Sequence, residues 1–208
     1  MQTDYRVRGH SVSDEDPAAS IALSYDDASG AYVGGSLIGT WSEGEPELLG
    51  FTANAGYAVR LDSRLSLDAG VAKTQYFYGY GTSRNYDYTE VYLGLTLPVV
   101  SARVSYSPDY HRNGTHALYG ELNSGIEPAA NWFISGHAGV LTHLETPPGN
   151  VPRQTWDWRI GATRQFGPYG VHLDVSGRIQ GRARYAYPSG AGTGRDPAAV
   201  VFSLTRAF

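Results

Sequence analysis

The chain has 208 residues, of which 26 are Gly and 16 are Tyr, and its 16 Lys and Arg against 20 Asp and Glu give a formal net charge of −4. It contains no Cys, which excludes disulfides, zinc–thiolate sites and a thiol nucleophile. The negative net charge and the absence of a Lys or Arg run exclude the basic surface that nucleic-acid binding requires. No apolar run approaches the ~18 residues of a transmembrane helix.

Apolar and polar residues alternate from the start of the chain, which is the pattern of a β-strand whose two faces meet different surroundings. In the first expected strand, Tyr5 and Val7 fall on one face, and Asp4, Arg6 and Arg8 fall on the other. Equivalent segments, bounded by turn-forming residues, recur to the end of the chain. They predict about twelve strands, at residues 2–9, 19–25, 31–41, 49–59, 65–72, 90–97, 100–106, 118–126, 134–140, 156–163, 169–178 and 200–208.

The alternation is clearest in residues 90–97, where Glu90 and Tyr92 lie on one face and Val91 and Leu93 on the other. Because the pattern recurs at roughly the ten-residue length of a membrane-crossing strand, we expect the apolar faces to meet lipid and the polar faces to line a lumen. An open sheet edge in lipid would leave backbone groups unpaired, so the sheet must close. We predict an all-β fold, a closed antiparallel transmembrane β-barrel of about twelve strands in an up-and-down meander, formed by a single domain over residues 1–208.

Long and short connections alternate along this meander, as in bacterial outer-membrane barrels. With the N-terminus in the periplasm, the long connections are extracellular. They are expected near residues 10–17, 42–47, 77–86, 108–115, 143–154 and 181–197. Aromatic residues suited to interfacial girdles stand toward the strand ends: Tyr25, Trp41, Tyr57, Tyr106, Trp132, Trp156, Tyr169 and Phe208.

The expected location is the bacterial outer membrane, where lipid and lipopolysaccharide would surround the barrel. Met1 is followed directly by Gln2 with no apolar leader, so we expect the mature form of an exported protein with an added initiator Met. Phe208 would end in the periplasm, where it resembles the terminal aromatic signal read by the barrel-insertion machinery. No oligomeric state is predicted.

A family resemblance rests on four segments: residues 4–9 (DYRVRG), 13–17 (SDEDP), 86–92 (YDYTEVY) and 105–110 (SYSPDY). In this order and spacing they resemble the proteobacterial TorF-type porin family, and the similarity with specific motifs runs from Asp4 to about Tyr119. The resemblance implies a Gram-negative outer-membrane barrel and a channel.

The polar faces carry the charged residues that we expect to line a pore. They are Asp4, Arg6, Arg8, Asp68, Glu90, Arg103, Glu121, His137, Asp157, Arg159, His172, Asp174 and Arg178. The near balance of acids and arginines in this set predicts weak ion selectivity.

Two interpretations of the lumen follow from the barrel size, since about twelve strands lie between the filled eight-stranded barrels and the open porins of about sixteen strands. In the first, the protein is a porin-like channel for passive diffusion of ions or small polar solutes. In the second, acids and arginines pair across the lumen and occlude it, and the long loops serve surface binding or a structural role.

A membrane-embedded lipid hydrolase is a third hypothesis, which would need a Ser with a His base near the lipid interface. The nearest candidate, His10–Ser11, lies in an expected loop without a supporting motif.

The carboxylates of residues 14–16 could bind Ca²⁺, although a solvated acidic loop is the expected interpretation. The six histidines show no close ligand spacing. We therefore expect no enzyme activity, no cofactor and no metal site.

Overall fold

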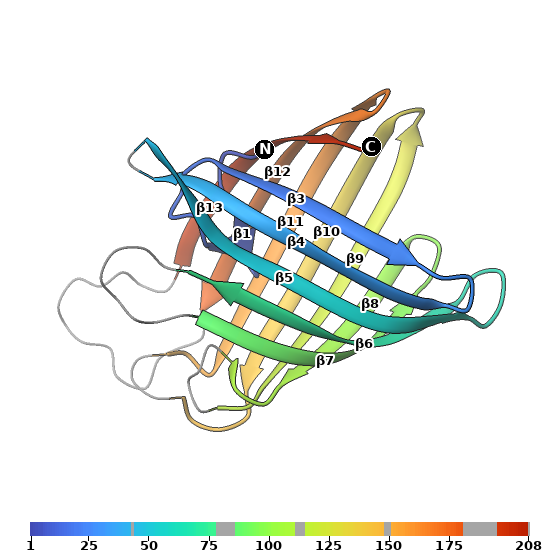
Figure 1. The fold of residues 1–208 in the computed structure, drawn as a ribbon, viewed down its shortest axis with the longest axis horizontal. Helices are drawn as coiled ribbons and strands as arrows, with labels where there is room; N and C mark the ends of the chain where they lie inside the picture. Colours follow the sequence, from blue (N-terminus) through green and yellow to red (C-terminus); the bar gives the residue numbers. More distant parts are fainter. Residues whose placement is uncertain (43, 78–85, 111–114, 148–150, 181–194, 208) are drawn as a thin grey trace.

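A computed structural model describes residues 1–42, 44–77, 86–110, 115–147, 151–180 and 195–207 (Figure 1). Among these residues no helix is long and apolar enough to cross a membrane. Thirteen strands follow one another in chain order: β1 (Arg6–Val7), β2 (His10–Ser11), β3 (Ala18–Asp26), β4 (Ala31–Ser42), β5 (Glu45–Arg60), β6 (Ser66–Tyr76), β7 (Tyr86–Thr96), β8 (Val100–Ser107), β9 (Ala117–Ala129), β10 (Trp132–His143), β11 (Gln154–Phe166), β12 (Tyr169–Gln180) and β13 (Arg195–Arg206).

Strands β3 to β13 form one eleven-stranded antiparallel sheet in which each strand pairs with its sequence neighbours, so the predicted up-and-down meander is confirmed. Five connections are short and share one end of the sheet, here called the short-turn end. They comprise residues 27–30, 61–65, 97–99, 130–131 and 167–168. The opposite end, here called the long-loop end, carries the remaining connections (Figure 1).

At the long-loop end the expected loop over residues 42–47 is wrong, because β4 and β5 continue to the pair Ser42↔Glu45. The central parts of four other expected loops, residues 78–85, 111–114, 148–150 and 181–194, lie outside the described residues, as does Phe208.

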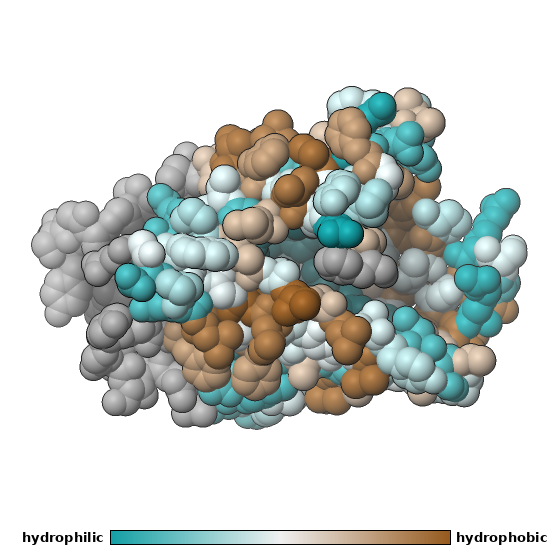
Figure 2. Space-filling model, turned by 45° about the horizontal axis from the view of Figure 1, so that its top comes forward, coloured by the Kyte–Doolittle hydropathy of each residue, from teal (hydrophilic) through white to brown (hydrophobic). Residues whose placement is uncertain are grey.

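The two faces of the sheet have opposite character. On β7 the residues Val91 and Leu93 are 55% and 69% exposed, whereas Glu90 and Tyr92 are 8% and 6% exposed. Exposed apolar residues such as Leu23 and Ile21 also occur on β3. Figure 2 shows broad apolar patches on the outer surface. An exposed apolar surface of this extent is far larger than water-soluble monomers carry, which indicates a lipid-facing belt.

Aromatic residues border this belt at both ends of the strands. Exposed residues toward the short-turn end are Tyr25, Tyr57, Trp132 and Tyr169. Trp41 and Trp156 are exposed toward the long-loop end. These positions match the expected interfacial girdles.

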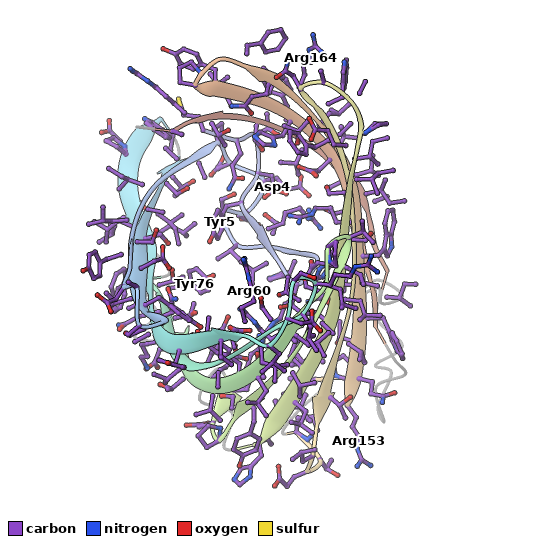
Figure 3. All side chains as sticks on the ribbon, turned by 90° about the vertical axis from the view of Figure 1, so that its right-hand side faces the viewer. Asp4, Tyr5, Arg60, Tyr76, Arg153 and Arg164 are labelled. Carbon is purple, nitrogen blue, oxygen red and sulfur yellow. The ribbon has the colours of Figure 1, made fainter. Side chains whose placement is uncertain are left out.

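The first residues of the chain connect the two edges of the sheet. Gln2 pairs antiparallel with both Ala18 on β3 and Ser203 on β13. The Gln2 amide donates to the Ala18 carbonyl at 2.8 Å, and the Thr3 amide donates to the Phe202 carbonyl at 3.0 Å. Residues 1–3 therefore supply a short additional wall segment between β3 and β13, and the sheet becomes a ring (Figure 3).

Residues 4–16, here called the N-terminal hairpin, leave the wall and fold into the ring, where β1 pairs with β2 (Figure 3). The prediction of a wall strand over residues 2–9 is therefore wrong beyond Thr3, and residues 10–16 are not part of an extracellular loop. Tyr5 and Val7, which we expected to face lipid, pack inside the ring against a buried apolar cluster that includes Val12. The backbone takes positive φ angles at Arg8 and Gly9, which turn the chain back on itself between β1 and β2.

One wall residue also departs from the expected alternation. The pairing of β4 with β5 shifts between Ile38 and Gly39, so that Leu49 becomes the extra residue of a β-bulge. Its side chain is 5% exposed and packs in the interior, although a regular strand would have pointed it outward together with Phe51.

Candidate functional site

The ring encloses a cavity of about 900 Å³ whose lining is mainly polar. Asp26, Ser66 and Thr96, each at the end of its strand, line the cavity, so it extends to the rim of the short-turn end. Arg8 and Gly9 of the N-terminal hairpin also line it. The hairpin thus bounds the cavity on the side away from the short turns.

In the long-loop half of the lumen, an apolar cluster joins the hairpin to the wall. Val12 of the hairpin contacts a cluster with Ile38, Leu49 and Tyr76 from three consecutive wall strands. The buried members of this cluster are at most 5% exposed, so the cluster excludes water between the hairpin and the wall. Burial raises the pKa of the Tyr5 phenol despite its hydrogen bond with Tyr76, so Tyr5 is neutral at physiological pH.

Arg8 is held against the opposite wall by a carboxylate and three aromatic rings. Its Nη2 donates to both carboxylate oxygens of Glu90, at 2.7 and 2.9 Å. The guanidinium carbon lies 3.9 Å from the ring centroid of Tyr119, 5.2 Å from that of Tyr110 and 5.5 Å from that of Tyr88. These four residues, Glu90, Tyr88, Tyr110 and Tyr119, are here called the Arg8 cage.

The cage rings are held by contacts of their own. Tyr88 and Tyr110 pack with ring centroids 4.8 Å apart. Tyr119 donates through its hydroxyl to Asp157, with O···O distances of 3.1 and 3.3 Å. Burial raises the pKa of Tyr110, although the nearby Arg8 acts in the opposite direction, so this ring is also neutral at physiological pH.

The hairpin has an internal polar network that fixes its shape. Arg6 donates to Asp4 at 2.8 Å and to the Gly9 carbonyl at 2.6 Å. The Ser11 hydroxyl donates to Asp4 at 2.6 Å and accepts from the Glu15 amide at 2.8 Å. Ser11, the nearest candidate for a nucleophile, is therefore built into the hairpin as a structural residue.

Gly9 brings the tip of the hairpin against the wall. A Cβ atom at this position would lie 2.8 Å from the Gly177 carbonyl oxygen and 2.9 Å from the Asp157 Cβ, and φ is +72°. Only glycine fits both the backbone angle and the close approach.

Asp157 and His137 form a second polar group beside the cage. The Nε2 atom of His137 lies 2.8 Å from Asp157 Oδ1, and its Nδ1 atom lies 2.7 Å from Asn123 Oδ1. Glu121 approaches the same ring at 3.8 Å. The imidazole on β10 is thus fixed between oxygen atoms of its two neighbouring strands, β9 and β11.

Nearer the short-turn end, Tyr32, Tyr92 and Arg103 surround Asp68. The Tyr32 hydroxyl donates to Asp68 at 3.0 Å, Arg103 donates to it at 3.2 Å, and the two tyrosine hydroxyls are 2.7 Å apart. The Arg103 guanidinium lies 4.4 Å from the Tyr92 ring centroid.

Glycines on the lumenal face make room for these side chains to lie along the wall. A Cβ at Gly70 would lie 2.4 Å from the Tyr92 hydroxyl, and one at Gly139 would lie 2.2 Å from the Tyr119 hydroxyl. A side chain that lies over a neighbouring glycine occupies less of the lumen, so the glycines preserve the cavity.

Most of the thirteen expected pore-lining residues border the cavity. They are Asp4, Arg6, Arg8, Asp68, Glu90, Arg103, Glu121, His137, Asp157, Arg159 and Asp174. His172 instead bridges Thr163 and Thr205, at 2.8 Å from each. Arg178 lies on β12 beside Gly9.

The tyrosines of the site are absent from the expected pore-lining set. Alternation places Tyr92 on the polar face beside Glu90, but the set contains only charged residues and histidines. Tyr110 follows β8 and carries no periodic signal, so only its contacts in the structure reveal its role.

The fold and the cavity define a β-barrel with an apolar outer face and a polar lumen. The model of the family described as "Bacterial protein of unknown function (Gcw_chp)" matches residues 1–208, and the chain belongs to this family. No curated protein matches the chain.

Three solved structures are similar to the fold. A NanC porin in a rhombohedral crystal form has a TM-score of 0.61 at 11% sequence identity, with 100% of this chain and 98% of that chain covered. A KdgM porin has a TM-score of 0.57 at 11% identity, with 93% and 94% covered. A KdgM porin in complex with disordered oligogalacturonate has a TM-score of 0.57 at 11% identity, with 100% and 95% covered. These likenesses confirm the predicted fold class.

Proposed function

We propose that the protein is an outer-membrane channel for small polar solutes, which the N-terminal hairpin closes and whose path opens when the hairpin leaves the lumen. One observation carries the proposal: a polar cavity of about 900 Å³ reaches one rim of a lipid-facing barrel and is bounded within it by a hairpin bound through noncovalent contacts. A purely structural barrel has no need of a cavity of this size, since side chains can fill a small barrel completely.

The comparisons support a channel in general terms. Both named porins share the fold, and one of them was solved with an oligogalacturonate, which is a polar solute. The resemblance of residues 4–9 and 86–92 to TorF-type porins agrees with this assignment. In this chain those two segments carry Arg8 and Glu90, which join the hairpin to the wall.

The test removes the hairpin and leaves the wall intact. Because Gln2 pairs antiparallel with Ala18, Thr3 stands opposite Pro17, and a two-residue Asn-Gly turn can replace residues 4–16. Vesicles that contain this hairpin-less variant should release a trapped small neutral sugar much faster than vesicles that contain the unchanged protein. If the folded variant releases no sugar, the channel proposal is wrong.

A second candidate follows from the apolar cluster around Val12, which joins the hairpin to the wall in the long-loop half of the lumen. In that case the hairpin never leaves, and the barrel is permanently occluded and acts through its long-loop surface. Vesicles that contain the unchanged protein separate the two functions, because a permanently occluded barrel releases no sugar, whereas a channel whose hairpin leaves at times releases it slowly.

A further inference from the structure

The Arg8 cage has the composition of a binding site for an organic cation. A carboxylate that accepts two hydrogen bonds from one guanidinium nitrogen, with tyrosine rings around the same group, combines charge-assisted bonding with cation–π attraction. Arg8 thus occupies the cage as a ligand supplied by the chain itself.

The cage belongs to the wall and not to the hairpin. Tyr88 and Glu90 lie on β7, Tyr119 lies on β9, and Tyr110 lies in the connection between β8 and β9. The packing of Tyr88 on Tyr110 and the hydrogen bonds of Tyr119 do not involve Arg8. The rings therefore keep these contacts when Arg8 leaves, and Glu90, which is 8% exposed, is left without its cation.

The cage does not satisfy Arg8 completely. Its Nη1 atom is buried and has no hydrogen-bond partner among the described residues. A solute cation that is free to orient itself can therefore compete with a guanidinium whose position the hairpin backbone fixes.

The cavity provides a route to the cage, since Tyr88, Glu90 and Tyr119 all line it. Its charge also favours cations. The acidic residues that line it are Asp4, Asp26, Asp68, Glu90, Glu121, Asp157 and Asp174, against Arg6, Arg8, Arg103 and Arg159. The expected pore-lining residues contained nearly equal numbers of acids and arginines. The cavity is more acidic because Asp26 lines it, whereas Arg178 and His172 do not. Excess negative charge within low-dielectric walls raises the local concentration of cations.

We propose that the Arg8 cage binds small solutes with a guanidinium or amine group, and that such a solute replaces Arg8 and releases the hairpin. The class of solute follows from the cage and the cavity charge. The opening step rests on the proposed channel function, whereas binding in the cage does not.

The test measures the binding of agmatine, a small guanidinium-bearing amine, by calorimetry on folded barrels in detergent. Arg8→Ala removes the internal competitor, so agmatine should bind this variant about tenfold or more tightly than it binds the unchanged protein. Adding Glu90→Gln to Arg8→Ala should abolish that gain. Arg64→Ala, in an exposed short turn, makes the same change in net charge and should leave the affinity unchanged.

Agmatine affinity that is the same with and without Arg8 would overturn the proposal, as would tighter binding of galacturonate, a sugar acid, than of agmatine by Arg8→Ala. Arg8→Gln, which retains part of the aliphatic stem, replaces Arg8→Ala in this test if Arg8→Ala does not fold.

The channel proposal and the cage proposal can fail independently of each other. A tenfold gain in affinity together with an impermeant hairpin-less variant contradicts the channel alone, whereas a permeant hairpin-less variant without the gain contradicts the cage alone.

Discussion

At the scale of single residues, the contact between Arg8 and Glu90 shows how one ion pair joins two parts of the chain that are 82 residues apart. The side chains are 14% and 10% exposed, so the pair is shielded from solvent. Breaking a buried pair by removing one partner costs about 3–5 kcal/mol, because the remaining charge stays desolvated. The pair therefore holds the hairpin in place more strongly than a surface ion pair would.

Glu90→Gln should loosen the hairpin by about 3 kcal/mol, since Arg8 loses its carboxylate partner. Limited trypsin digestion of the folded barrel, followed by mass spectrometry, measures how fast the bond after Arg8 is cut. We expect much faster cleavage in the variant. Glu45→Gln, at an exposed position at the start of β5, is the control. Equal cleavage rates in Glu90→Gln and the unchanged protein would show that the pair does not secure the hairpin.

Gly139→Ala should disturb the Arg8 cage without altering any charge. The added Cβ would lie 2.2 Å from the Tyr119 hydroxyl and 2.8 Å from an Asp157 oxygen, so Tyr119 must move from its place beneath Arg8. The same trypsin assay should report faster cleavage after Arg8. Gly120→Ala is a matched control on β9, since its Cβ would meet only a Val140 methyl group at 3.9 Å. If both variants behave alike, the position of Tyr119 does not matter for docking.

At the scale of elements, alternation predicted the wall strands well. On β7 it assigned Val91 and Leu93 to the outer face and Glu90 and Tyr92 to the inner face, as the structure shows. The reason is physical, since lipid and lumen impose opposite polarity on successive residues over a full strand.

The same rule failed for residues 4–9, where Tyr5 and Val7 also alternate with charged residues. These apolar side chains pack against the buried apolar cluster around Val12, and the charged ones contact one another and the wall. A two-sided environment therefore exists inside the lumen as well. Alternation cannot distinguish lipid from an interior apolar cluster. Leu49 shows a second limit, because a β-bulge shifts the alternation without a distinctive sequence.

The N-terminal hairpin should depend on Val12 to stay docked in the lumen, because this residue is 5% exposed and belongs to the apolar cluster. Val12→Ala removes about 1–2 kcal/mol of apolar contact, and Val12→Asp places a carboxylate in an apolar site at a larger cost. Sugar release from vesicles should therefore rise from the unchanged protein to Val12→Ala and further to Val12→Asp. The absence of any rise in folded Val12→Asp would mean that the cluster does not close the lumen.

At the scale of the whole molecule, the apolar outer surface should behave as a lipid-facing belt. Leu23→Arg, at a position 82% exposed on β3, should cost about 2 kcal/mol or more in folding into bilayers. The matched control, Leu61→Arg, lies in a short turn outside the strands and should fold nearly as the unchanged protein does. Refolding yield into vesicles, read by the gel mobility of unheated samples, measures the difference. Equal yields for the two variants would contradict a lipid-facing role for β3.

The measurement that tests the account most directly is the single-channel current across a planar bilayer, for the unchanged protein and for the hairpin-less variant in which Asn-Gly replaces residues 4–16. The account predicts steady unitary currents from the hairpin-less variant, and smaller or briefer currents from the unchanged protein, whose lumen the hairpin closes. Identical currents from the two proteins, or a folded hairpin-less barrel that carries no current, would contradict it.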